Sequence, residues 1–345
     1  MAGTGMRRVD VELYRHPGER ECAERLERIP KFQWLLDAAA AHIGGKAERQ
    51  VEIASMARVS AGVYPRLAEM WRETLAVFGL ADAPLHIGYL DPQPWTVRGD
   101  DRDPRLIVSS IMLEAVPEDE MGALLAMAAG SFRLGHARYL AVCDFLRRMR
   151  DFSGIAGAPA VMLSWAFENW RRAAAFSADR AAALAIRDPR PVLSLLERLA
   201  GVKSRAWGGV TEPERLRIQG LEAAAWGGDW QAGRWRRFAM AMDRRNNLTL
   251  VRRLDLSDWA SKDRYRAILD GEPVEPENMP GNAEDMADPG LAFWGEFAVP
   301  RDDDADRPDS VLKDAAGEFR DAAEKGMQSF IKAGEAFWNS FIDKR

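Results

Sequence analysis

Histidine and cysteine are scarce in this 345-residue chain. The four histidines, none of which lies four residues from another, are His16, His42, His86 and His136. A catalytic zinc ion needs about three protein ligands and one open position, so this histidine pattern argues against a zinc site. The two cysteines, Cys22 and Cys143, are too few for a disulfide framework and are typical of a reducing compartment. We expect both thiols to be buried and inert.

Long apolar runs and an excess of one charge are absent as well. The 48 Lys and Arg residues nearly balance the 53 Asp and Glu residues, which leaves a formal net charge of -5. Such a chain has no basic surface of the kind that nucleic acid or anionic lipid selects. No run approaches the roughly 18 uninterrupted apolar residues of a membrane span, and the first residues lack the apolar core of a signal peptide. We therefore expect a cytoplasmic protein that binds no nucleic acid.

The sequence does have a helical periodicity, which one group of short strands interrupts. Apolar residues recur at three- and four-residue steps over 18–43, 61–78 and 160–187. Pro30 divides the first of these stretches, Gly79 suits the end of the second, and Pro117 opens a further helix. Short apolar stretches bounded by turn residues predict strands over 85–90, 95–97 and 105–108. We also expect residues 248–251 to be extended.

Composition divides the chain into four parts. We expect a flexible N-terminus over 1–16 and one large, mostly helical domain over 17–270. Residues 271–309 are rich in proline and acidic side chains, so they predict a flexible linker. An aromatic island at 291–297 is too apolar to stay in solvent, and we expect it to dock on the domain. Residues 310–345 predict a long amphipathic helix.

The apolar face of the predicted terminal helix must be covered by its own domain, by another protein chain or by a membrane surface. The large side chains on this face are Phe319, Met327, Phe330, Phe337, Trp338 and Phe341. Acidic and basic residues balance on the opposite face, so the strongly basic surface of a lipid-binding helix is missing. We therefore expect a protein partner or self-association through these side chains, in preference to a membrane surface.

Four stretches of the chain, taken in order, resemble the M48 family of HExxH zinc metallopeptidases. They are PWTV (94–97) with RLIVSS (105–110), EMGALLAMAAGS (120–131) with LGHA (134–137), WRRAAAFSADRA (170–181), and LVR (250–252) with Trp259 and YRAIL (265–269). Their shared order is more telling than any one of them, and the third is the most specific. The resemblance implies a mainly helical, α+β zincin-like fold with a small sheet beside the active-site helix.

The residues that carry the chemistry of the M48 family are missing at the corresponding positions. In that family, two histidines four apart on one helix face bind zinc and a glutamate activates the metal's water. Here that pentapeptide is MAAGS. Met127 and Ser131 take the positions of the two histidines, and Ala128 takes the position of the glutamate. The family's third ligand, a glutamate, corresponds to Ala175. The resemblance therefore implies that zinc is lost and that no cofactor replaces it.

The remaining polar residues of the old cleft have structural interpretations. We expect His136 to make a structural hydrogen bond, and Ser131, five residues earlier, is offset around the helix from it. Asp179 corresponds to a family aspartate that supports a ligand histidine, so without that ligand we expect it to pair with an arginine such as Arg180 or Arg172. The candidate cleft residues are His136, Asp179, Arg180 and Asn246.

The sequence thus favours a catalytically inactive M48 homologue that acts as a binding, scaffolding or regulatory subunit. An active paralogue is one candidate partner, and an extended chain could add as a strand near Ile107. The rival hypothesis is an active zinc metalloendopeptidase, or a hydrolase that uses His136, Asp179 and Glu168. Metal analysis of untagged protein separates these hypotheses.

Overall fold

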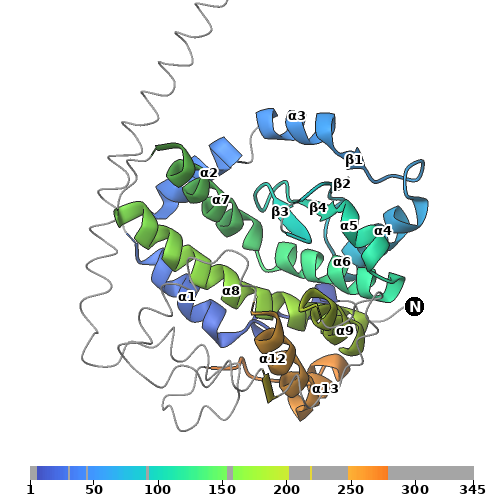
Figure 1. The fold of residues 1–345 in the computed structure, drawn as a ribbon. Helices are drawn as coiled ribbons and strands as arrows, with labels where there is room; N and C mark the ends of the chain where they lie inside the picture. Colours follow the sequence, from blue (N-terminus) through green and yellow to red (C-terminus); the bar gives the residue numbers. More distant parts are fainter. Residues whose placement is uncertain are drawn as a thin grey trace, which may run out of the picture.

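The computed structural model describes residues 6–29, 32–43, 46–90, 93–153, 158–201, 218–219 and 248–278. Two short 3-10 helices, η1 (Met6–Arg8) and η2 (Val11–Leu13), come first. The α-helices are α1 (Pro17–Glu27), α2 (Phe32–Ile43), α3 (Lys46–Ser55), α4 (Pro65–Phe78), α5 (Ser110–Ala115), α6 (Glu118–Arg133), α7 (His136–Ser153), α8 (Ala158–Ile186), α9 (Arg190–Leu199), α12 (Thr249–Ser261) and α13 (Asp263–Asp270). The strands are β1 (Ala57–Arg58), β2 (Leu85–Gly88), β3 (Trp95–Arg98) and β4 (Arg105–Ser109). The predicted mainly helical α+β fold is confirmed (Figure 1).

Local sequence signals account for most of these boundaries. The helical stretch around Pro30 is divided, with α1 ending at Glu27 and α2 beginning at Phe32. Gly79 adopts a left-handed conformation, with φ of 66°, and ends α4 as predicted. The three predicted strands are β2, β3 and β4.

The four strands form one mixed sheet in the order β1-β2-β4-β3. β2 pairs with β4 in parallel, whereas β3 pairs with β4 antiparallel. Ile107 of β4 lies between His86 of β2 and Thr96 of β3, so its strand has a partner on both sides. Ile107 itself therefore has no open edge, and an extended chain that adds to the sheet near it would pair with β3. The free sheet edge on this side is β3, since no described strand pairs with its other edge.

The pair α6 and α8 forms the centre of the helical body, and the sheet lies on the other side of α6 (Figure 1). Almost every side chain of α6 from Met121 to Phe132 is buried, as in a helix that is apolar all round. Small residues allow the two helices to approach closely. A Cβ atom at Gly130 would lie only 2.6 Å from the Cβ of Ala181 on α8.

Residues 6–16 are part of the folded body, so the prediction of a flexible N-terminus is wrong for this segment. Met6 and Tyr14 are buried in the main core, and the backbone N–H of His16 donates to Ser177 Oγ at 2.8 Å. The Nδ1 atom of His16 also accepts from the backbone N–H of Gly18 at 3.1 Å, which caps α1. Isolated apolar residues between charged ones carry no periodic signal, so the sequence did not reveal this docking.

Residues 248–251 were expected to be extended, and this prediction is also wrong. Leu248 has φ of 50° and precedes α12, which begins at Thr249. The β-branched residues of this stretch favour strands locally, but Val251 and Leu254 are buried with helical spacing. Because α12 packs on α8 and α9, tertiary contacts outweigh the local preference.

Several sequence predictions lie outside the described residues. They concern the linker beyond residue 278, the aromatic island at 291–297, the terminal helix over 310–345, and Asn246. These stay predictions. In the described parts of the chain, no helix is long and apolar enough to cross a membrane.

Candidate functional site

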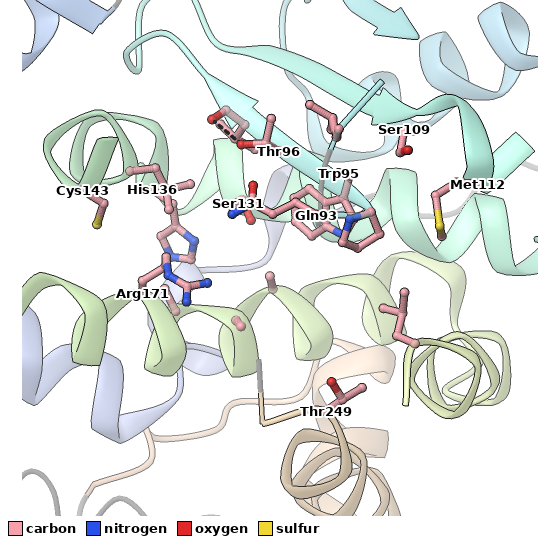
Figure 2. A pocket seen from close by; sticks show the side chains of 18 of the residues that line it. Gln93, Trp95, Thr96, Ser109, Met112, Ser131, His136, Cys143, Arg171 and Thr249 are labelled. Atoms are coloured by element: carbon pink, nitrogen blue, oxygen red, sulfur yellow. Dashed lines mark hydrogen bonds between the residues drawn. The ribbon is translucent and has the colours of Figure 1, made fainter. Parts of the chain in front are cut away.

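A cavity of about 480 Å³ lies where the resemblance placed the zinc site (Figure 2). Its walls come from β3, α5, α6, α7, α8, α9 and α12. Ser131 of α6 and Ala175 of α8 line it, as do Trp95 of the edge strand and Thr249 of α12. The cavity therefore lies between the free sheet edge and the pair of central helices.

The four positions that correspond to zinc ligands and base divide into two groups. Ser131 and Ala175 line the cavity, whereas Met127 and Ala128 are buried in the hydrophobic core and do not line it. The hydroxyl of Ser131 donates to the carbonyl oxygen of Met127 at 3.0 Å. Within the described residues, no group of three or more His, Cys, Asp or Glu side chains is placed to hold a metal ion. A methyl group and a hydroxyl that donates to the main chain do not fit zinc.

His136 begins α7, lines the cavity and is almost fully buried. Its Nε2 lies 3.1 Å from Oε1 of Glu19 on α1, and its ring meets Trp170 edge-on with centroids 5.3 Å apart. Burial alone would raise the pKa of Glu19, but the charges of His136 and Arg15 and the hydrogen bond from His136 keep it below 4.5. The structural hydrogen bond that we expected for His136 is present, and its partner is a residue of the N-terminal helix.

Asp179 forms a buried two-pronged ion pair with Arg252 of α12. Nε and Nη2 of Arg252 lie 2.8 and 2.6 Å from the two carboxylate oxygens. Burial raises the pKa of Asp179 above its usual value, while the charge of Arg252 lowers it. The expected pairing of Asp179 with an arginine is confirmed, but the partner is neither Arg180 nor Arg172 and comes from a helix 73 residues away.

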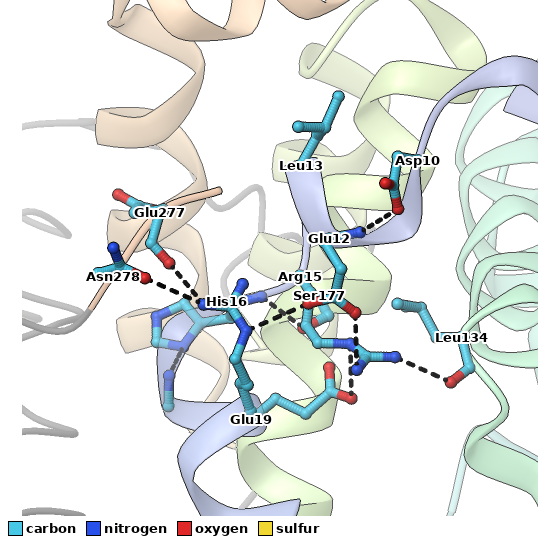
Figure 3. Close-up of polar contacts among 12 residues, drawn as sticks. Asp10, Glu12, Leu13, Arg15, His16, Glu19, Leu134, Ser177, Glu277 and Asn278 are labelled. Atoms are coloured by element: carbon cyan, nitrogen blue, oxygen red, sulfur yellow. Dashed lines mark hydrogen bonds and ion pairs between the residues drawn. The ribbon is translucent and has the colours of Figure 1, made fainter. Parts of the chain in front are cut away.

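Arg180 does not line the cavity and instead belongs to a second buried network. Its guanidinium contacts Asp255 at 3.1 Å and Glu277 at 2.6 Å, and Asp255 lies 3.4 Å from Nε2 of His16. Burial alone would raise the pKa of Asp255, but Arg180 and His16 hold it well below its usual range. Arg20 donates to the carbonyl oxygen of Glu277 at 3.0 Å. Arg20 also donates to Oδ1 of Asn278 at 3.3 Å, and Figure 3 shows Glu277 and Asn278 beside His16 at the start of α1.

The sequence interpretation of the cleft named one arginine, Arg180, and missed the arginines that line the cavity. The four arginines that line the cavity are Arg147, Arg171, Arg198 and Arg252. Arg147 pairs with Asp144 at 2.7 Å and Arg171 with Glu168 at 2.6 Å, both at i,i+3 spacing. That spacing is visible in the sequence. The pairs of Arg198 with Glu120 and of Arg252 with Asp179 are long-range, so no local signal marks them.

Cys143 lines the cavity but has the properties of an inert thiol. Burial raises its pKa well above 9.0, and its Sγ lies 3.7 Å from the carbonyl oxygen of Phe167. A thiol that stays protonated at neutral pH is a poor nucleophile. Cys143 is therefore a poor candidate for a nucleophile.

Fold and cavity define a mainly helical α+β protein, in which a cavity lined by both apolar and charged side chains lies beside two tightly packed helices. The chain is 23% identical over 275 residues to the plastoglobule-localized metallopeptidase 48 of Arabidopsis thaliana, which is a chloroplastic protein. The match covers 76% of this chain and 76% of the plant protein. This distant similarity supports a relationship to the M48 metallopeptidases. No family model matches the chain, and no solved structure matches it.

Proposed function

We propose that this chain is a catalytically inactive relative of the M48 metallopeptidases, and that it acts as a binding, scaffolding or regulatory subunit. The observation that carries the proposal is the lining of the cavity at Ser131 and Ala175, where the relationship places two zinc ligands. Neither side chain offers an imidazole or a carboxylate. A zinc ion activates water only when about three protein ligands hold it.

The rival hydrolase would need His136, Asp179 and Glu168 to act together. Asp179 does not line the cavity and is bound to Arg252, while Glu168 is bound to Arg171. His136 has its Nε2 on Glu19, so it is held as a structural element of the wall. These three contacts favour the inactive protein over a hydrolase with this set of residues.

Metal content and peptide cleavage test the loss of chemistry. Protein purified without a histidine tag should hold far less than one zinc per chain by mass spectrometry. It should not cleave an unstructured protein such as casein, with or without added zinc. Stoichiometric zinc together with chelator-sensitive cleavage would sink the proposal.

Partner binding rests on the predicted terminal helix and on the cavity. Full-length protein and a variant that ends at residue 308 are compared in capture experiments from the native host, followed by mass spectrometry. The proposal expects specific partners, an active paralogue among the candidates, that are lost with the helix. The same partners on both forms would show that the helix is not the contact.

A further inference from the structure

The charges around the cavity are distributed unevenly. Each of the four lining arginines has a carboxylate partner, but only two of those partners, Asp144 and Glu168, line the cavity themselves. Glu120 and Asp179 do not line it and bind Arg198 and Arg252 away from the open space. On the side of α9 and α12, the positive end of each ion pair therefore faces the cavity.

Arg252 is the best-fixed of these cations. Its side chain is buried, with 7% of its surface exposed, and Asp179 holds both Nε and Nη2. In the part of the chain that the structure describes, the third nitrogen, Nη1, has no hydrogen-bond partner and is not sealed from solvent. Since Arg252 lines the cavity and Asp179 fixes its guanidinium, Nη1 is the nitrogen of this side chain that is left to bind a ligand.

Apolar side chains make up much of the remaining wall. Trp95, Met112, Leu140 and Leu199 line the cavity together with the alanines of α8. Its volume of about 480 Å³ lies within the range of roughly 300–1,000 Å³ that small-molecule sites occupy. The combination of apolar walls with one oriented donor is typical of sites that bind an amphipathic ligand by its polar end.

The sign and size of the charge at the cavity wall indicate which polar group of a ligand fits. A guanidinium donates strongly to anionic oxygen atoms. Arg98 shares Asp144 with Arg147, so among the described residues five arginines meet the four carboxylates of these ion pairs, which leaves one positive charge and not the two that a dianion such as a phosphomonoester needs. One open nitrogen on one buried cation fits a single negative charge.

We propose that the cavity binds an organic monocarboxylate with an apolar body, whose carboxylate accepts a hydrogen bond from Nη1 of Arg252. The inference rests on the proposed function only because a resident zinc ion would compete for the same carboxylate. Two sources share this chemistry: a small carboxylic acid, and the C-terminal carboxylate of an apolar peptide. The free edge of β3 beside the cavity gives an extended peptide further backbone groups to bind.

Calorimetric titration of the full-length protein tests the proposal. The ligands are decanoate, 1-decanol, and an apolar tetrapeptide with either a free or an amidated C-terminus. We expect decanoate or the free-acid peptide to bind roughly tenfold or more tighter than its uncharged counterpart, as a charged hydrogen bond implies. The tighter of the two acids identifies the source.

Variants show whether Arg252 is the contact. Arg252→Gln alone leaves Asp179 buried without its partner, so the test uses Asp179→Asn/Arg252→Gln, which keeps a neutral hydrogen-bonding pair. This double variant should lose roughly tenfold or more in carboxylate affinity and keep its decanol affinity. Arg266→Gln, at an exposed position of α13, is the matched control and should bind as the unmodified protein does.

Three results would overturn the proposal: equal binding of acid and uncharged counterpart, undiminished carboxylate binding by the folded double variant, or no binding of either acid. Zinc content and casein cleavage are measured on the same preparation. Stoichiometric zinc with cleavage refutes the proposed function whatever the titration shows. A zinc-free, inactive protein that binds neither acid refutes this inference alone.

Discussion

Replacing Gly130 by alanine tests how closely α6 and α8 pack beside the cavity. The added Cβ would lie 2.6 Å from Cβ of Ala181, well inside the roughly 3.5–4.0 Å of a normal carbon contact. A Cβ atom cannot rotate away, so the helices must separate. Overpacking a core costs about 1–3 kcal/mol, while alanine is favoured over glycine in a helix by about 1 kcal/mol. The difference is about 0–2 kcal/mol, and a contact this close between two Cβ atoms favours its upper end, so we expect Gly130→Ala to lower the free energy of unfolding by about 2 kcal/mol.

A second substitution on the facing helix separates the clash from other effects. Ala181→Gly removes a buried methyl group, worth about 0.8 kcal/mol, and loses about 1 kcal/mol of helix preference. Gly130→Ala/Ala181→Gly exchanges the two residues and should regain stability to within about 1 kcal/mol of the unmodified protein. Urea unfolding followed by far-ultraviolet circular dichroism measures all four proteins. If Gly130→Ala is as stable as the unmodified protein, or if the two single effects add, the close packing is refuted.

Four further predictions address the charges, the thiols and the metal. Asp179→Ala should lower the free energy of unfolding by about 3–5 kcal/mol, because it leaves the charge of Arg252 buried and unpaired. A melting temperature equal to that of the unmodified protein would contradict this. The pKa of Glu19 is lowered by folding, so its carboxylate stabilises the protein above pH 4.5 and loses this effect as the pH falls through the folded-state pKa. In urea titrations, the difference in unfolding free energy between the unmodified protein and Glu19→Gln should therefore become smaller below pH 4.5. A difference that stays constant with pH would contradict the ion pair. Burial raises the pKa of Cys22 to about 12, so Ellman's reagent at neutral pH should label this thiol only after unfolding, with Cys22→Ala as the control. Neither zinc nor a chelator should shift the melting temperature, and a zinc-dependent rise would reveal a site.

Local patterns predicted the elements of this fold, because the signals for helices and strands lie within a few residues of each other. Pro30 and Gly79 act on their own neighbours, and the short strands are bounded by turn residues that the sequence displays. The break near Pro30, the end of α4 at Gly79 and the short strands were therefore predicted correctly. The short N-terminal segment differs, since Met6 and Tyr14 are ordered only by contacts with distant elements.

The candidate site was less predictable, because its polar contacts join distant parts of the chain. The partners of Asp179 and His136 lie 73 and 117 residues away, on α12 and α1. A sequence pattern indicates that a buried acid needs a cation, but it does not indicate which arginine supplies it. Residues 248–251 were mispredicted for the same reason, because packing on α8 and α9, which the sequence does not reveal, stabilises α12 as a helix.

Arg252 is needed at the cavity wall because Asp179 is buried, whether or not a ligand binds. A carboxylate that is 1% exposed is costly as a free charge, and burial pushes its pKa upward. Arg252 offsets this cost with two hydrogen bonds, which fixes the plane of the guanidinium and leaves Nη1 as the nitrogen without a partner among the described residues. The proposed absence of zinc therefore does not leave the cavity wall without charge. A carboxylate that enters it meets a donor that is already oriented, so binding requires little further ordering of the protein.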